Sequence, residues 1–266
     1  MQDLRNILVP TNFSPNATNA LIYGINLAEQ IDAHLYIAHV QDDNKDPLAT
    51  EVIEDRFEQI KHDFLFRRTL RTSLILRHGQ TAAELESIIK DKGIDLMIMG
   101  MLGGSRRHEA NFGSLTTYFI NDPKCALISI PGDCRILTIK QIALASDYTM
   151  VPVESEIYTL SYIAGSFSSK FHVFTVQKSK SEPEGKLHIE QNFKNLFRYN
   201  LSSFHAIDAP SVISATREFI EKNNIDLLAV FHMINPQKDP VKRSVSKQLA
   251  FVLRIPLLVV PIQCKF

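Results

Sequence analysis

The sequence predicts an α/β protein of two tandem, doubly wound, Rossmann-like domains, each with a parallel sheet of five strands. Short apolar segments alternate with amphipathic ones along the whole chain, which is typical of such sheets. Several segments also recur in the same order at nearly constant spacing. The 266 residues suit two domains of about 100–150 residues each. We expect domains at 1–133 and 138–266, with a linker at about 131–137.

The internal repeat is clearest in the strand segments. Three segments recur in one order: 93–99 as 224–230, 126–131 as 256–261 and 7–12 as 142–147. Gly93 and Asn224 are equivalent, and each stands where a helix should end. Both residue types tolerate the left-handed conformation that closes a helix.

The first domain reads as alternating strands and helices. The strands expected are 4–10, 34–40, 73–77, 96–99 and 126–130. Ser14 should cap the first helix, with Pro15 in its first turn. An amphipathic helix is expected at 47–70, and Thr81 with Glu84 forms a candidate capping box for the next helix. The wholly apolar segment 96–99 indicates a sheet that is covered on both faces.

The second domain repeats this alternation. Its strands are expected at 139–145, 171–176, 202–207, 226–230 and 257–260, with helices between them. Such an order favours right-handed crossovers and a ligand site at the carboxyl ends of the strands, where the strand order reverses.

A glycine-rich loop follows the fourth strand. Gly100 and Gly103 would let the backbone approach a ligand closely, and Gly113 and Ser114 would place free amides and a hydroxyl at a helix N-terminus. These features suit a phosphate group. A plain turn between strand and helix is the alternative interpretation.

The spacing of glycine, two residues, glycine, nine residues and glycine-serine resembles the loop of ATP-binding members of the universal stress protein family. The resemblance covers the first 131 residues best, and it implies an adenine-nucleotide-hydrolase-like fold. It further implies a site for ATP or another adenine nucleotide, with or without Mg²⁺. The residues implied are Pro10, Thr11, Asn12, Val40, Met99, Gly100, Leu102, Gly103, Gly113, Ser114, Leu115 and Thr116.

The resemblance also assigns roles to these residues. Residues 10–12 would contact the ribose and adenine, Val40 would meet the adenine through its main chain, and 99–100 would form the floor. The loop and the following helix would surround the phosphates. Asn12 departs from the family, in which aspartate is usual, and an amide oxygen accepts a weaker hydrogen bond than a carboxylate.

The second domain shows the opposite pattern. Asp147 supplies the acid, but Phe231, Ile234 and Arg243 replace the three glycines of the loop. We therefore expect no ATP site of this type in the second domain.

Composition excludes several classes of protein. Lys+Arg and Asp+Glu are 29 each, so no basic excess favours nucleic acid. No apolar run approaches the ~20 residues of a membrane helix. Three sparse cysteines are typical of a reducing compartment, so we expect a cytoplasmic protein. Catalytic and metal-binding motifs are not evident, and the scattered histidines, including His34, His39, His172 and His205, read as satisfied structural residues.

We therefore expect a stress-response regulatory protein that binds an adenine nucleotide in its first domain, with little or no catalysis. By the resemblance, the fifth strands, 126–130 and 257–260, should pair within the chain as a pseudo-twofold dimer. A further homodimer and an unidentified protein partner would fit this role. The alternatives are a nucleotide-independent interaction or scaffold protein and, less favoured, a slow ATP hydrolase.

Overall fold

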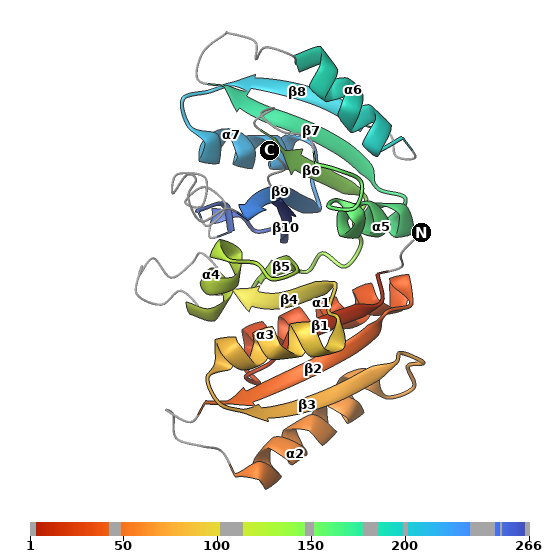
Figure 1. Ribbon diagram of the computed structural model, residues 1–266, viewed down its shortest axis with the longest axis vertical. Helices are drawn as coiled ribbons and strands as arrows, with labels where there is room; N and C mark the ends of the chain where they lie inside the picture. The colour runs from red at the N-terminus through yellow and green to blue at the C-terminus, as the bar shows by residue number, and fades with distance from the viewer. Residues whose placement is uncertain are drawn as a thin grey trace.

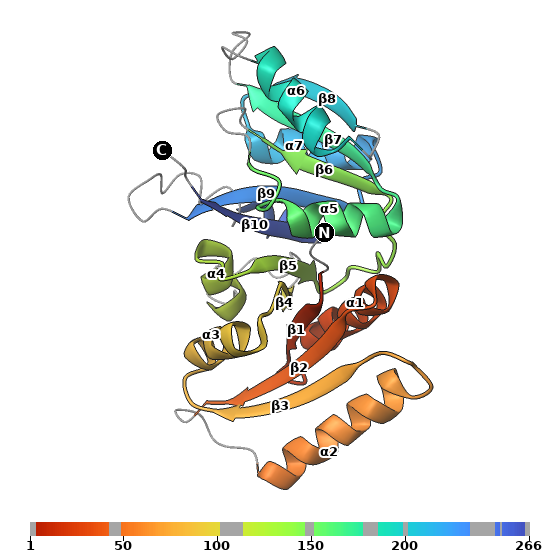
Figure 2. The ribbon, with the colours of Figure 1, turned by 45° about the vertical axis from the view of Figure 1, so that its right-hand side comes forward.

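The computed structural model describes residues 4–42, 49–101, 114–146, 152–177, 186–198, 202–234, 248–250 and 252–263. Their strands form one sheet of ten, in the order β3-β2-β1-β4-β5-β10-β9-β6-β7-β8. Figure 2 shows β3 at one end, β8 at the other, and β5 beside β10 in the middle.

The helices and strands alternate along the chain (Figure 1). The first half contains β1 Asn6–Pro10, α1 Pro15–Ile31, β2 His34–Gln41, α2 Thr50–Ile60, the π-helical turn η1 Lys61–Leu65, β3 Thr72–His78, α3 Thr81–Lys92, β4 Leu96–Met101, α4 Ser114–Asn121 and β5 Ala126–Pro131. The second half contains β6 Gln141–Ala145, α5 Tyr158–Phe167, β7 Lys170–Gln177, α6 Lys186–Leu196, β8 Ser202–Asp208, α7 Val212–Lys222, β9 Leu227–Ile234 and β10 Leu257–Gln263.

The two halves meet through their fifth strands. All other neighbouring strands are parallel, whereas β5 and β10 are antiparallel. Leu258 pairs with Ile128 at the centre of this seam, and Ser129 Oγ donates to the carbonyl of Leu257 at 3.5 Å. The expected pairing of the fifth strands is confirmed. The two predicted five-stranded sheets are consequently joined into one.

Equivalent carboxylates fix the start of the first strand in each half. Asp95 Oδ2 accepts the main-chain N–H groups of residues 5 and 6 at 2.9 and 3.0 Å. Asp226 Oδ2 accepts those of residues 140 and 141 at 2.8 and 2.9 Å. The same arrangement of hydrogen bonds therefore occurs in both halves of the chain.

The helix ends match the expected residue types with one exception. Gly93 and Asn224 are left-handed, with φ of 56° and 50°. Ser14 caps α1, because its Oγ accepts the N–H of Ala17 at 3.3 Å. The capping box expected at the start of α3 is wrong. Thr81 is already helical, and the N–H of Glu84 donates to the carbonyl of Gln80 instead.

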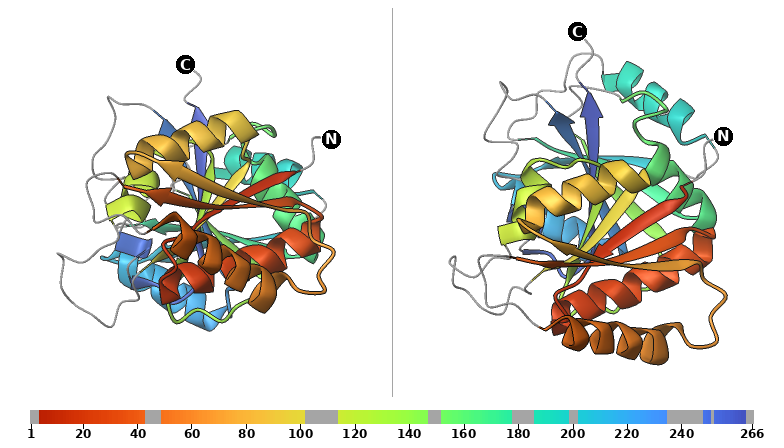
Figure 3. Two further views of the ribbon diagram at one scale, coloured as in Figure 1. Left: turned by 90° about the horizontal axis from the view of Figure 1, so that it is seen from below. Right: turned by 60° about the horizontal axis from the view of Figure 1, so that its bottom comes forward.

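Helices cover both faces of the sheet (Figure 3). Side chains of α1, α2, α5 and α6 form one hydrophobic core, and those of α3, α4 and α7 form the other. Successive residues of a strand point to opposite faces, so Ile7 and Val9 of β1 join the first core and Leu8 joins the second. This explains why the central strands are apolar throughout, as the sequence predicted.

Candidate functional site

The strands of the first half separate at the point where their order reverses. β1 pairs with β2 along its whole length, from Asn6 to Pro10. It pairs with β4 only through Ile7 and Leu8. The carboxyl ends of β1 and β4 are therefore unpaired with each other, which is where ligands enter a doubly wound sheet.

The connection from β1 to α1 is held by local hydrogen bonds. The N–H of Thr11 donates to the carbonyl of Ala38 at 2.8 Å, and Thr11 Oγ1 accepts the N–H of Phe13 at 3.0 Å. Asn12 Oδ1 accepts the N–H of Ser14 at 3.2 Å in an Asx turn. Asn12 is exposed, and its side chain also carries the Nδ2 amide, which can only donate.

Phe13 and His39 hold this connection in contact with the second strand. Phe13 has φ of 60°, a conformation that bulky residues rarely adopt. Its ring lies 4.7 Å from that of His39 and meets Phe57 of α2 edge-on at 5.7 Å. His39 Nδ1 lies 2.8 Å from the carbonyl of Thr11, and because a carbonyl only accepts, Nδ1 carries the hydrogen.

His39 differs from the satisfied structural residue that the sequence suggested. Its Nε2 is buried and has no hydrogen-bond partner among the residues that the structure describes. The position of His39 in the sequence could have indicated a role at the site, because it lies directly before Val40 near the end of the second strand.

Other histidines are satisfied as expected. His34 Nε2 lies 2.9 Å from Ser73 Oγ. His172 Nδ1 and His205 Nε2 share Ser203 Oγ at 2.9 and 2.8 Å. Burial lowers the pKa of His34, His172 and His205.

Gly100 has a packing role that the sequence did not reveal. A Cβ at this position would lie 2.3 Å from the main-chain oxygen of Asn16, in the first turn of α1. The carbonyl of Gly100 accepts the hydroxyl of Thr116 at 3.1 Å, and Thr116 is 4% exposed. Gly100 therefore joins β4 to both α1 and α4.

The remaining predicted residues divide into two groups. Met99 is buried in β4, and the side chains of Val40 and Leu115 pack against the second core. Ser114 begins α4. Leu102, Gly103 and Gly113 lie outside the described residues. The structure thus gathers the ends of β1, β2 and β4 near the start of α4, without placing the glycine loop.

The corresponding region of the second half is built differently. β6 and β9 remain paired up to Ala145 and Val230, two positions beyond the last equivalent pair of the first half. Phe231 replaces Gly100, since each lies opposite the residue that precedes the strand-closing proline. The Phe231 side chain packs against the first core. Asp147 and Arg243 lie outside the described residues.

The first site lacks fixed charges in the part of the chain that the structure describes. None of its predicted residues in that part is acidic or basic. No group of three His, Cys, Asp or Glu residues there is placed to hold a metal ion. Within the same residues no helix is long and apolar enough to cross a membrane. A ligand at this site would be bound by main-chain groups and neutral side chains.

Comparison with known proteins identifies the first half. The model of the universal stress protein family matches residues 3–131. The first half of the chain is therefore similar to the universal stress protein family. No protein of curated function matches the sequence significantly.

Solved structures share the fold over nearly the whole chain. A universal stress protein from Archaeoglobus fulgidus DSM 4304 has a TM-score of 0.78 at 12% identity, covering 98% of this chain and 99% of its own. A putative universal stress protein from Pseudomonas aeruginosa UCBPP-PA14 has a TM-score of 0.62 at 12% identity, covering 97% and 94%. The cytoplasmic domain of a prokaryotic cation chloride cotransporter reaches 0.60 at 10% identity, covering 96% and 94%. The fold of this chain is therefore similar to that of universal stress proteins and of the cytoplasmic domain of a transporter.

Proposed function

We propose that this protein is a stress-response regulator that binds ATP or a related adenine nucleotide in its N-terminal domain. The domains proposed are 1–133 and 138–266. The observation that carries the proposal is the separation of β1 from β4 beyond Leu8, within the residues that match the universal stress protein family. The second domain would be a partner without an equivalent site, because β6 and β9 stay paired to Ala145.

The nucleotide would lie across the ends of the separated strands. Its ribose and adenine would contact residues 10–12 and the main chain of Val40, and its phosphates would lie near the first turn of α4. N–H groups at a helix N-terminus favour an anion. The Asn12 Nδ2 amide would donate to a ribose hydroxyl, because Oδ1 already accepts from Ser14. This neutral bond is weaker than one to a carboxylate.

Little or no catalysis is proposed. His39 places an imidazole at this connection, and its Nδ1 hydrogen already points to the carbonyl of Thr11. Without a carboxylate among the described site residues, a Mg²⁺ ion would be held mainly by phosphate oxygens and water. A nucleotide-independent scaffold is the alternative, and its support is the weaker hydrogen bond expected from Asn12.

Calorimetric titration of the purified protein with ATP tests the proposal. We expect one nucleotide per chain and loss of binding in Gly113→Asp, which places a carboxylate beside the phosphates. Arg243→Asp changes the equivalent position of the second domain and is the matched control, so its affinity should equal that of the wild type. Asn12→Asp should bind more tightly.

Three outcomes would contradict the proposal. Absence of saturable binding would favour the scaffold. Binding that is indifferent to Gly113→Asp would place the nucleotide elsewhere. Sustained release of phosphate by the purified protein would favour an enzyme.

A further inference from the structure

We propose that a groove between α1 and residues 132–137 binds a short extended segment of a partner protein, which presents a carboxylate beside apolar side chains. The groove lies outside the proposed nucleotide site. The inference therefore does not depend on nucleotide binding.

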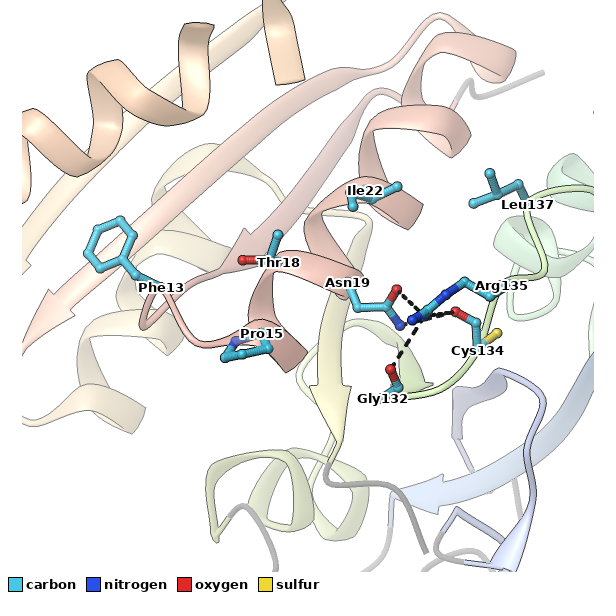
Figure 4. A pocket seen from close by; sticks show the side chains of 9 residues that line it. All are labelled: Phe13, Pro15, Thr18, Asn19, Ile22, Gly132, Cys134, Arg135 and Leu137. Carbon is cyan, nitrogen blue, oxygen red and sulfur yellow. Dashed lines mark hydrogen bonds between the residues drawn. The ribbon is translucent and has the colours of Figure 1, made fainter. Parts of the chain in front are cut away.

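The groove has the size and lining of a ligand site. Its volume is about 490 Å³. One wall is formed by Pro15, Thr18, Asn19 and Ile22, which lie on one side of α1 at helical spacing. Figure 4 shows Leu137 and Arg135 on the opposite wall, with the Arg135 side chain reaching across toward Asn19. Apolar walls with a few fixed polar groups are typical of sites that orient a ligand.

Arg135 is held in place without a negative partner. Its Nη1 donates to Asn19 Oδ1 at 3.1 Å and to the carbonyls of Gly132 and Cys134 at 3.4 and 2.8 Å. Asn19 is fixed in turn, because its Nδ2 donates to the carbonyls of Pro131 and Cys134 at 3.0 and 3.2 Å. All of these acceptors are uncharged.

The charge of Arg135 is consequently available to a ligand. No carboxylate in the described part of the chain lies within ion-pair distance of Arg135. The guanidinium presents a planar fork whose position is already set, and this fork matches a carboxylate in two-point contact.

The backbone beside Arg135 favours a peptide over a small molecule. Residues 134–140 belong to neither a helix nor a strand. The main-chain N–H and C=O groups of Leu137 and Thr138 make no hydrogen bond within the described residues, and Leu137 is 46% exposed. An extended peptide can satisfy such groups along its own main chain while its side chains enter the groove.

Selection of peptides from a phage-displayed library of random heptapeptides tests the inference. The target is the full-length protein without nucleotide, and Arg135→Glu serves for counter-selection. We expect enrichment of sequences with aspartate or glutamate beside an apolar residue. Fluorescence anisotropy with a selected synthetic peptide should show affinity lower by about ten- to a hundredfold in Arg135→Glu, as for a charge-assisted hydrogen bond.

Two further variants separate the groove from other surfaces. Thr18→Phe fills the groove without changing its charge, so it should weaken binding of the same peptide even if Arg135→Glu fails to fold. Arg71→Glu reverses the charge of an exposed side chain that lies outside the groove, so this variant should bind the peptide like the wild type.

Several results would overturn the inference. They are the absence of enriched peptides, enrichment of peptides without an acidic residue, and peptide binding that Thr18→Phe does not affect. Self-association of the wild type that Thr18→Phe abolishes, measured by sedimentation, would identify a second copy of this chain as the occupant instead.

Discussion

Substitution of Gly100 by alanine separates a packing role from a ligand role. The added Cβ would lie 2.3 Å from the main-chain oxygen of Asn16 and 2.7 Å from its carbonyl carbon. Both atoms belong to backbone in the first turn of α1, so they cannot move aside like the end of a flexible side chain. Gly100 does not have a positive φ, so the cost is steric and does not arise from backbone strain.

The expected loss is about 2 to 3 kcal/mol in the free energy of unfolding, at the upper end for an overpacked site. Urea denaturation followed by circular dichroism, without nucleotide, measures it. Gly165→Ala is the matched control, because a Cβ at Gly165, in the last turn of α5, meets nothing within 4 Å. This change should raise the free energy of unfolding by about 0.5 to 1 kcal/mol through helix propensity.

A Gly100→Ala variant as stable as the wild type would refute this reasoning. If that variant also lost ATP binding, glycine would be needed only for close approach of the ligand. A Gly165→Ala variant that lost stability would show that the contacts of α5 differ from those described.

The remaining predictions concern the strand ends, the histidines and a thiol. Asp95→Ala and Asp226→Ala should each lower the free energy of unfolding by about 2 to 3 kcal/mol in urea titrations, because each removes the charged acceptor of two main-chain N–H groups. Burial, together with neighbouring basic groups, lowers the pKa of His172 and His205, so the unfolded chain binds protons more readily than the folded one. The free energy of unfolding should therefore fall as the pH drops through about 6.5, and less steeply in His172→Gln. Burial raises the pKa of the Cys125 thiol to about 12, so mass spectrometry should find it unmodified by iodoacetamide at pH 8 until the protein unfolds.

Each of these predictions has a contradicting result. Asp133 is exposed and serves as a control. If Asp133→Ala lowered the free energy of unfolding as much as Asp95→Ala, the strand-start carboxylates would have no particular stabilising role. A pH profile unchanged by His172→Gln would assign the dependence to other groups. Rapid alkylation of Cys125 in the folded protein would contradict the raised pKa of its thiol.

Most of the fold follows from local patterns in the sequence. The apolar segment predicted at 96–99 is the core of β4, Leu96–Met101, and the left-handed ends at Gly93 and Asn224 follow from residue type. Longer-range contacts account for the differences. β9 was predicted to end at residue 230 but continues to Ile234, because His232 and its neighbours pair with the equally extended β10.

Helix ends were less predictable where no capping residue marks them. The helix predicted at 47–70 is the shorter α2, Thr50–Ile60, followed by η1, Lys61–Leu65. Arg67 then adopts φ of 66°, so the chain turns before reaching residue 70. The charged amphipathic pattern of this segment continues past the turn, so it does not predict where the helix ends.

The site was predictable in its location more than in its contacts. The resemblance located the ends of the first, second and fourth strands, and the expected replacement of Gly100 by Phe231 follows the strand register. The sequence did not reveal that Gly100 packs on α1, that Thr116 bonds to Gly100, or that His39 fixes Thr11. Those contacts join segments far apart in the chain, so no local pattern encodes them.

The antiparallel seam between β5 and β10 has an evolutionary consequence. In a dimer of identical chains every substitution appears twice, so a residue that harms one pocket harms both. Here the pairing partners are covalently linked, and their effective concentration for each other is independent of how much protein is present. Each partner can then differ from the other, as Phe231 and Gly100 do at equivalent positions of the two halves. A single chain thus combines the geometry of a symmetric pair with freedom for one member to specialise.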